Sequence, residues 1–529
     1  MAYHTLLFLV VFLPLVVICY QLAGQKYRPM VLLLAGYIFF FSFSRMLFLY
    51  LLGTTVVLYV AGIAIEKRQL IFKEQKKGLE RDAIKALKKT ITKQKRRILM
   101  VGLLILLGVL LFVKYYNFFA ENVTGLFSLL MLPVGLPQLR ILQPIGISFY
   151  TLQGIGYLVD VYEGKVEAEH HFGKLALFMA FFPQLMEGPI SRYGQTAEQL
   201  YAGTPVTERS LTMGACRICF GMLKKICIAD RLNPFVAHIF EGYIYCNGTT
   251  IFLGALAYTV QLYMEFSGCM DIVIGVAEIF GVTLPENFRQ PFFSKNVSEF
   301  WRRWHITLGE WLKDYIFYPV SLSEGVKKAG NRAKDKFGKH GSKIVVSAAA
   351  LFPVWLSNGI WHGARWSYIF FGIYYFVLIL LSVIFEPLFE TFREHFPKLV
   401  NHPLYHVFQM LRTGILVVIG EMFFRAAGLK HGMLMFAQMV GNFHLRELFS
   451  RNLLELGLDF QDFVIVFLGI VVVFVVSYWH EKNIHIREKI ASLPVPARWC
   501  IYYALLLSVI LFGAYGDGYL AVELIYAGF

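Results

Sequence analysis

The sequence predicts an all-α protein that crosses a membrane many times. Its 529 residues are 57% hydrophobic and 16% charged, whereas soluble globular domains average about a quarter charged and slightly under half apolar residues. Long apolar segments recur along the chain, and about twenty apolar residues span a bilayer as a helix. These segments lack the alternation of β-strands, and lipid requires a spanning segment to satisfy its hydrogen bonds internally. We therefore expect transmembrane helices throughout the chain.

The apolar segments predict about 11 to 13 tilted helices that span the membrane or re-enter it. The first follows Met1–Thr5, which lacks Lys and Arg, and no cleavage site follows it. We expect a retained helix there rather than a signal peptide. Shorter or Gly- and Pro-interrupted segments indicate re-entrant helices at 120–134, 143–160 and 269–282. The other segments are 6–22, 30–46, 47–65, 98–116, 172–187, 210–229, 250–266, 343–360, 366–386, 405–424, 462–480 and 499–516.

The basic residues predict how the chain is oriented in the membrane. Lys and Arg crowd into residues 67–97 and 321–343 and carry most of the net charge of +15. Basic loops stay in the cytoplasm, so counting back through three helices places the N-terminus outside. Basic residues beside membrane spans favour contact with anionic lipid head groups and give no support to a nucleic-acid partner. No repeat is visible, so we expect a single membrane domain over residues 1–529.

His362 is the first of two histidines with an unusual setting. It lies between two apolar segments, 343–356 and 366–386, together with Asn358. Ionisable groups near membrane depth are costly and usually face a cavity or a pathway. Glycines on both sides of His362 permit close approach of a backbone or a ligand. The alternative is a buried histidine that bonds a carbonyl at a helix junction.

His305 is the second. Residues 300–314 have the spacing of one amphipathic helix, with Trp301, Trp304 and His305 on its aromatic face and Arg303 off it. A Trp-rich amphipathic helix suits a membrane surface or the rim of a cavity. A surface anchor explains the Trp and Arg residues, but it explains a histidine on the buried face poorly.

The chemistry that these histidines suit is acyl transfer to a hydroxyl. A neutral histidine can take the hydroxyl proton, because its ordinary pKa lies near working pH. The sequence contains no G-x-S-x-G elbow and no H-E-x-x-H metal motif, and the single C-x-x-C at Cys216–Cys219 lacks partners for a metal site. We therefore expect direct transfer from a bound thioester, with no metal and no resident cofactor. A covalent acyl-enzyme stays open.

At these two histidines the sequence resembles the membrane-bound O-acyltransferase (MBOAT) family. Within that family it is most similar to the bacterial alginate O-acetyltransferase branch, which is related to the teichoic-acid D-alanyl transfer proteins. The resemblance covers most of the chain, with its motifs in order. The motifs are Pro144–Phe149, Phe182–Leu185, Gly188–Arg192, Gly221–Asp230, Tyr263–Gly268, Pro285–Phe288, the His305 segment through Pro319, Trp361–Gly363, Phe424–Ala426 and Ile525–Phe529.

The resemblance implies that His362 is the catalytic histidine and that His305 is its partner. It implies transfer of an acetyl group from a cytoplasmic donor, acetyl-CoA or an acylated carrier protein, to a cell-surface polysaccharide. The transfer is direct or passes through an extracytoplasmic partner protein, and it occurs at the plasma membrane of a bacterium. The implied fold is a ring of tilted helices around a central tunnel. The candidate substrate-binding and supporting residues are Asn358, Trp361, Trp304, Asp271, Glu265 and Arg303.

The chain also departs from the branch. Glu265 stands where the branch usually has Asp, Glu187 where it has Ala, and Glu421 near a common Trp. We expect Glu187 and Glu421 to line the tunnel and to alter the choice of acceptor, which leaves the polymer open. Two alternatives remain. One is D-alanyl transfer to teichoic acid, and the other is a non-enzymatic transporter or flippase of a polysaccharide intermediate, since broken segments with polar groups also suit transport.

Overall fold

Helices make up most of the chain. The structure is a computed structural model, and it describes residues 1–515 apart from the side chains of Phe449, Arg451 and Asn452. Of the described residues, 80% are helical, and they contain no β-strand beyond an isolated antiparallel bridge between Phe288 and Trp304. The all-α prediction is therefore confirmed. The predicted motif Ile525–Phe529 lies outside the described residues.

Membrane-spanning helices are present as predicted. Within residues 1–515, seven helical segments are long and apolar enough to cross a bilayer. The protein is thus a multi-pass membrane protein, while the central tunnel stays a prediction. The segments are Arg28–Gln75, which joins α2 and α3, and then α4 (Arg81–Leu129), α15 (Glu324–His362), α16 (Trp366–Ile384), α19 (Pro403–Arg425), α21 (Phe460–Glu481) and α23 (Val495–Phe512).

Three predicted segments are wrong. The predicted re-entrant segments 120–134 and 269–282 lie mostly within the long helices α4 and α11 (Gly248–Ile279) instead of forming separate helices. Residues 172–187 form two short helices, α6 (Phe172–Ala180) and α7 (Phe182–Leu185), instead of one continuous helix. Phe181 between them is extended, with φ −61° and ψ 103°. Pro183 at the start of α7 has no N–H to extend a hydrogen-bonded helix and restricts the residue before it.

Two compact units divide the chain, and the prediction of a single membrane domain stays untested. Among the described residues, unit 1 contains 1–215 and 273–285, and unit 2 contains 216–272 and 286–515. Helices α9 (Glu208–Met222) and α11 (Gly248–Ile279) contribute residues to both units. The other helices of unit 1 are η1 (Leu7–Phe12), α1 (Leu13–Leu22), α2 (Arg28–Ser44), η2 (Arg45–Leu47), α3 (Phe48–Gln75), α4, α5 (Ile147–Glu163), α6, α7 and α8 (Tyr193–Ala202).

Unit 2 carries both histidines of interest. Its helices before His362 are η3 (Leu223–Ala229), α10 (Asp230–Glu241), η4 (Tyr243–Tyr245), η5 (Pro291–Phe293), α12 (Val297–Arg303), α13 (Ile306–Leu312), η6 (Lys313–Phe317), α14 (Tyr318–Ser321) and α15. The later ones are α16, α17 (Glu386–His395), α18 (Pro397–Val400), α19, α20 (Leu429–Gly441), η7 (Leu445–Phe449), η8 (Arg451–Glu455), α21, α22 (Ile486–Ala491) and α23.

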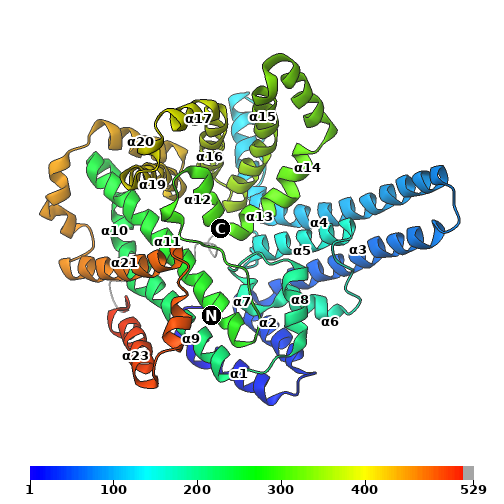
Figure 1. Cartoon of the computed structure of the whole chain (residues 1–529), viewed down its shortest axis with the longest axis horizontal. Coiled ribbons are helices and arrows are strands. Elements are labelled where there is room, and N and C mark those ends of the chain that lie inside the picture. The colour runs from blue at the N-terminus through cyan, green and yellow to red at the C-terminus, as the bar shows by residue number, and fades with distance from the viewer. Residues whose placement is uncertain (516–529) are drawn as a thin grey trace. The chain divides into compact units, whose positions relative to one another are not determined.

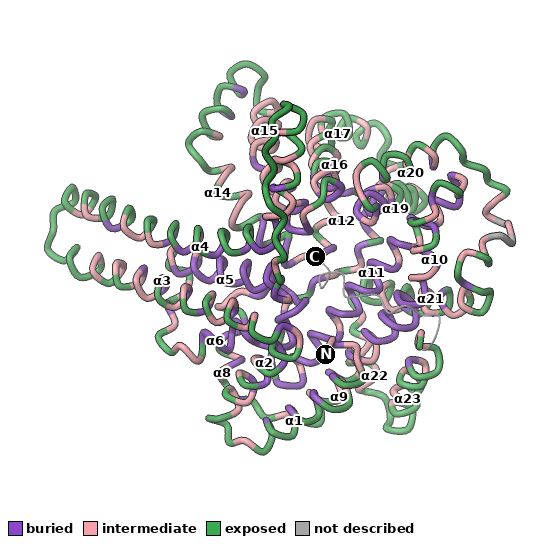
Figure 2. The backbone as a smooth tube through the Cα atoms, turned by 180° about the vertical axis from the view of Figure 1, so that it is seen from behind, coloured by how far each residue is buried: buried purple, intermediate pink, exposed green. Residues whose placement is uncertain are grey.

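In unit 1 the helices α3 and α4 form a long hairpin, and α5 packs along them (Figure 1). Glycines let these helices approach closely. A Cβ atom on Gly154 would lie 2.8 Å from a methyl of Leu58, and one on Gly102 would lie 2.7 Å from a methyl of Leu158. The basic stretch 67–97 occupies the distal end of the hairpin, where most side chains are exposed (Figure 2).

In unit 2 the helices α15 and α16 form a second hairpin, which positions His362 (Figure 1). Gly359 and Gly372 face the backbone of the opposite helix so closely that a Cβ atom on either would collide with a carbonyl oxygen. At the open end of the hairpin the Lys343 ammonium lies 2.5 and 2.8 Å from the two oxygens of the Glu386 carboxylate. His362 is the last residue of α15 and so lies at the closed end.

Candidate active site

His362 lies where α15 stops. The next residue, Gly363, has φ 154° and ψ 173°, a conformation that glycine adopts far more readily than residues with a side chain. The glycine therefore ends α15 and turns the chain toward α16. His362 itself is buried, with 5% of its side chain exposed.

Aromatic rings surround the His362 imidazole, and we call those of Trp361, Tyr368, Phe371 and Phe424 the aromatic cage. They come from α15, α16 and α19, and each is buried. The rings of Phe371 and Phe424 meet the imidazole edge to face, at interplanar angles of 83° and 86°, a favourable geometry for aromatic pairs. The centroid distances to the imidazole are 5.0 Å for Trp361, 6.4 Å for Tyr368, 5.9 Å for Phe371 and 4.9 Å for Phe424.

The prediction of one amphipathic helix over residues 300–314 is wrong. α12 ends at Arg303, and Trp304 is extended, pairing with Phe288 in the antiparallel bridge. His305 has the left-handed conformation, with φ 46° and ψ 50°, which costs a non-glycine residue free energy. Left-handed residues held in place by their surroundings often lie at functional sites.

Asn287 holds His305 in this conformation. The Asn287 amide oxygen lies 3.3 Å from His305 Nδ1 and accepts hydrogen bonds from the Thr307 hydroxyl and backbone N–H, at 2.9 and 3.1 Å. An amide oxygen only accepts, so this contact assigns the ring proton of a neutral His305 to Nδ1. Burial lowers the pKa of His305 to about 3, and the ring is therefore neutral at physiological pH.

Trp361 joins the two histidines. Its ring centroid lies 5.5 Å from that of His305 and 5.0 Å from that of His362. Phe266 of α11 covers His305 at 4.8 Å. The structure thus brings His305, Trp361 and His362 together in one buried aromatic cluster.

Two further predicted residues flank this cluster. Asn358 lies one turn before His362 on α15 and is buried, and its amide oxygen has no hydrogen-bond partner among the described residues. Trp304 packs beside His305 against the rings of Tyr263, Phe288 and Phe300. A buried amide oxygen without a protein partner is a group that a ligand or a water molecule can satisfy.

The other three predicted residues have ion-pair partners. The Lys225 ammonium lies 3.1 Å from the Glu265 carboxylate, and the Lys224 ammonium lies 2.7 Å from that of Asp271. Arg303 pairs with one glutamate of α12 and one of α21, at 2.8 and 2.7 Å. The sequence did not predict these ion pairs. A supporting role of the three residues in the chemistry stays a prediction.

Glu187 and Glu421, the two carboxylates at which the chain departs from the alginate O-acetyltransferase branch, lie in different units. Glu187 belongs to unit 1 and is 1% exposed. Glu421 belongs to unit 2, is also 1% exposed, and lies one helical turn before Phe424 on α19. Side chains three residues apart share a helix face, so Glu421 lies on the same face of α19 as the Phe424 ring of the aromatic cage.

Comparison with known proteins identifies the family. Residues 165–334, which include His305, match MBOAT, the membrane-bound O-acyltransferase family. A probable alginate O-acetylase AlgI of Pseudomonas aeruginosa is 34% identical over 474 residues, covering 88% of this chain and 80% of the relative. The chain belongs to the membrane-bound O-acyltransferase family. It is therefore an O-acyltransferase.

More distant relatives of this O-acyltransferase have other names. A peptidoglycan O-acetyltransferase of Helicobacter pylori is 28% identical, covering 83% of this chain and 80% of the relative. A teichoic acid D-alanyltransferase of Bacillus subtilis is 29% identical, covering 47% of this chain and 61% of the relative.

Asn287 is the site residue of this O-acyltransferase that sequence reasoning missed. It belongs to the motif Pro285–Phe288, but nothing in the spacing links it to a histidine eighteen positions later. The link depends on the bridge between Phe288 and Trp304, which brings the two segments side by side. The sequence signal was only that Asn287 precedes Phe288 in a motif that the resemblance had identified, and this signal is weak.

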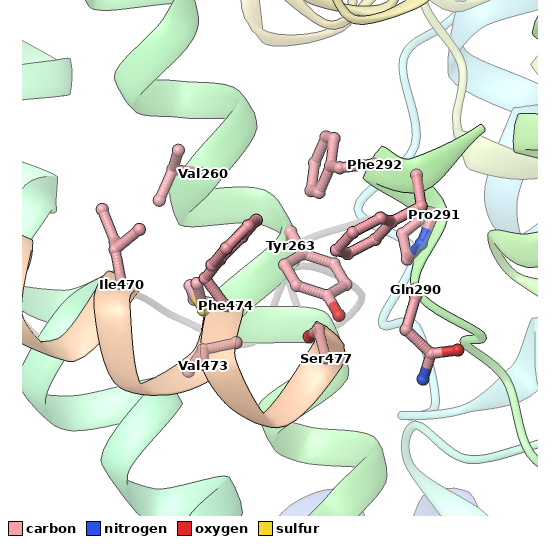
Figure 3. A pocket seen from close by; sticks show the side chains of 11 residues that line it. Val260, Tyr263, Gln290, Pro291, Phe292, Ile470, Val473, Phe474 and Ser477 are labelled. Carbon is pink, nitrogen blue, oxygen red and sulfur yellow. The ribbon is translucent and has the colours of Figure 1, made fainter. Parts of the chain in front are cut away.

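An apolar cavity of about 120 Å³ lies beside Tyr263 (Figure 3). Its walls come from α11, η5 and α21, and its polar groups are few. Two of its lining rings, Tyr263 and Phe292, also pack on the Trp304 ring, with centroid distances of 5.9 and 6.4 Å. The lining residues are Val260, Tyr263, Met264, Gln290, Pro291, Phe292, Phe293, Ile470, Val473, Phe474 and Ser477.

Proposed function

We propose that this O-acyltransferase moves an acetyl group from a thioester donor to hydroxyls of a cell-surface polysaccharide, with His362 as the general base. The observation that carries this proposal is the position of His362. It lies at the closed end of a helical hairpin, inside the aromatic cage, and Trp361 packs on both its ring and that of His305. Relatives named alginate O-acetylase and peptidoglycan O-acetyltransferase support the acetyl group and the polysaccharide acceptor.

The proposed reaction is a direct transfer. A neutral His362 takes the proton of the acceptor hydroxyl as its oxygen attacks the thioester carbonyl carbon. The new C–O ester bond forms, the C–S bond breaks, and His362 returns the proton to the departing thiolate. Holding both reactants beside one base in a water-poor setting lowers the entropic part of the barrier.

His305 acts as the neutral partner in this scheme. With the proton on Nδ1 directed at Asn287, its Nε2 carries a lone pair. That nitrogen is suited to accept a hydrogen bond from the acceptor and so to orient it. Asn358, Trp361 and Trp304 complete the proposed substrate-binding surface. Arg303, Asp271 and Glu265 support it through the ion pairs that fix α12 and α11.

The donor and the orientation are part of the same proposal. The basic stretches 67–97 and 321–343 face the cytoplasm of a bacterial cell, and the N-terminus lies outside. Their positive charge attracts an anionic donor, acetyl-CoA or an acylated carrier protein. The acceptor polymer, or an extracytoplasmic acyl-accepting partner protein, approaches from the opposite side of the plasma membrane.

The test replaces the proposed base. In the native cell, His362→Ala is expected to lower ester-linked acyl groups on the surface polysaccharide by about 100-fold or more, the usual contribution of a general base. Esters are released by mild alkali and quantified beside the amount of protein in the membrane. His395→Ala is the matched control, because His395 is exposed on α17. Unchanged ester content at a normal protein level contradicts the proposal.

A second candidate is transfer of D-alanine to teichoic acid, which the 29% identical D-alanyltransferase favours. Mass spectrometry of the alkali-released groups separates the two candidates, since one releases acetate and the other D-alanine. A transporter of a polysaccharide intermediate is the remaining alternative. Purified protein that acylates a soluble glycan without a lipid-linked intermediate excludes it.

A further inference from the structure

The aromatic cage limits the space beside His362. Phe371 and Phe424 are 2% and 5% exposed, and their ring centroids lie 5.1 Å apart. Both meet the imidazole edge to face. Protein interiors are close-packed, and an extra methylene forced into such a site displaces side chains or backbone.

Neighbouring phenylalanines of α19 face different surroundings. Phe424 packs on His362, on Tyr368 at 4.8 Å and on Phe371. Phe423 packs away from the cage, on Phe370 at 4.5 Å and on Phe436 at 6.1 Å. The two side chains are identical in size and both are buried. They differ in whether they reach His362, which makes them a matched pair for an experiment.

The proposed reaction places the acyl group inside this cage. The attacked carbonyl carbon bonds the acceptor oxygen, and that oxygen must lie within hydrogen-bond reach of the imidazole. The alkyl end of the acyl group therefore lies only a few bond lengths from the His362 ring. The rings nearest to the imidazole there are those of Trp361, Phe371 and Phe424.

We propose that Phe371 and Phe424 together set the length of the acyl group, accepting acetyl and rejecting straight chains of four or more carbons. This inference rests on the proposed function and adds a specificity-determining ring pair to it. A hydrophobic pocket discriminates by about 10- to 200-fold for each methylene. Butyryl transfer is therefore expected to be at least about 100-fold slower than acetyl transfer, because butyryl has two additional methylenes.

The test uses activated esters of increasing length with the full-length protein in lipid nanodiscs. p-Nitrophenyl acetate, propionate, butyrate and hexanoate each release p-nitrophenolate when water or an added glycan hydroxyl takes the acyl group. The rate that His362→Ala abolishes is the enzymatic one. Phe424→Ala is expected to raise the butyrate-to-acetate rate ratio by about 10-fold or more. Phe423→Ala, the matched control, is expected to leave that ratio as in the wild type.

Each outcome decides between the inference and the proposed function. An equal rate ratio in Phe424→Ala and wild type, with His362-dependent turnover intact, overturns the ring pair and leaves the proposed function standing. Absence of His362-dependent release from every ester contradicts the proposed function itself. Should Phe424→Ala fail to accumulate, Phe424→Leu and Phe371→Leu give the same comparison with a smaller cavity. Phe424→Trp, which narrows the cage, is expected to slow acetate as well.

Discussion

Two buried polar regions of unit 2 differ in how their charges are neutralised. Around the π-helix η3, Lys225 is fully buried, and its ammonium lies 2.7 Å from the Asp230 carboxylate and 3.1 Å from that of Glu265. In the histidine cluster the polar side chains lie among aromatic rings. Glu421 on α19 is 1% exposed and has no ion pair within the described residues. The first region pairs its buried charges, whereas the second contains a buried carboxyl group without an ion-pair partner among the described residues.

The paired region is tied together by close helix contact. Gly221 of α9 and Gly268 of α11 face each other, and a Cβ atom on either would lie less than 3 Å from the other's carbonyl oxygen. The π-helix then presents the consecutive residues Lys224 and Lys225 to acids of α10 and α11. π-Helical turns commonly mark places where a side chain is re-aimed. Removing one partner of a buried ion pair is strongly destabilising, because it leaves the other charge uncompensated.

Removing the central cation is expected to have the largest effect. Lys225→Met leaves two carboxylates buried without their shared counter-charge, which is expected to cost about 3–5 kcal/mol. Thermal unfolding of the purified protein in nanodiscs measures this cost. Lys328→Met, at an exposed position of α15, is the control. A Lys225→Met protein as stable as the control would show that the paired region is not structural.

Sequence patterns predicted the spans better than the site. The predicted segments 366–386 and 405–424 correspond to α16 and α19, because hydropathy alone identifies lipid-facing helices. The closed end of the α15–α16 hairpin was also predicted, since polar residues interrupt two apolar segments there. The break at His305 was not, because the spacing of its aromatic residues suits a continuous helix. Only the bridge to Phe288, a contact distant in sequence, reveals it.

The ion pairs were missed for a similar reason. Lys224 and Lys225 lie in a segment that the sequence alone predicts as an apolar span. Their partners Asp271 and Glu265 lie 47 and 40 residues later in the chain. A pairwise contact between helices leaves no periodic signal in either helix. The same reasoning explains why the neighbours Phe423 and Phe424 look equivalent in the sequence.

Acid is expected to destabilise the histidine cluster by an intermediate amount. Because burial lowers the pKa of His305 to about 3, the unfolded chain binds a proton between pH 6.5 and pH 3 that the folded protein excludes. Stability therefore rises with pH across this window, and the penalty vanishes above pH 6.5. From pH 7 to pH 5 the wild type is expected to lose about 2 kcal/mol through this group.

His305→Gln removes the titrating ring and is expected to remove that part of the acid sensitivity. Thermal midpoints at pH 7 and pH 5 measure it for the wild type and for the variant. His395→Gln, at an exposed position, controls for the loss of a histidine that folding does not desolvate. Equal acid sensitivity of wild type and His305→Gln would mean that His305 binds its proton as readily in the folded protein as in the unfolded chain.

Replacing Glu421 is expected to change the stability least, and it tests most directly whether the ion-paired region around Lys225 and the histidine cluster differ. Replacing a buried carboxyl group that lacks a counter-ion by an apolar side chain of similar size removes the cost of burying a polar group, and is expected to be neutral or slightly stabilising. Glu421→Leu is therefore expected to unfold at or slightly above the wild-type temperature. Glu265→Leu, which removes one partner of Lys225, is expected to unfold well below it.

Ester content separates a structural Glu421 from a functional one. If Glu421 meets the acceptor, Glu421→Leu changes which hydroxyls of the polymer are esterified while the protein stays folded. Mapping the esterified positions by NMR of the isolated polymer measures this. A Glu421→Leu protein as unstable as Glu265→Leu would mean that the two buried carboxylates do the same structural work. The presence or absence of an ion-pair partner would then not distinguish structural from functional carboxylates in this acyltransferase.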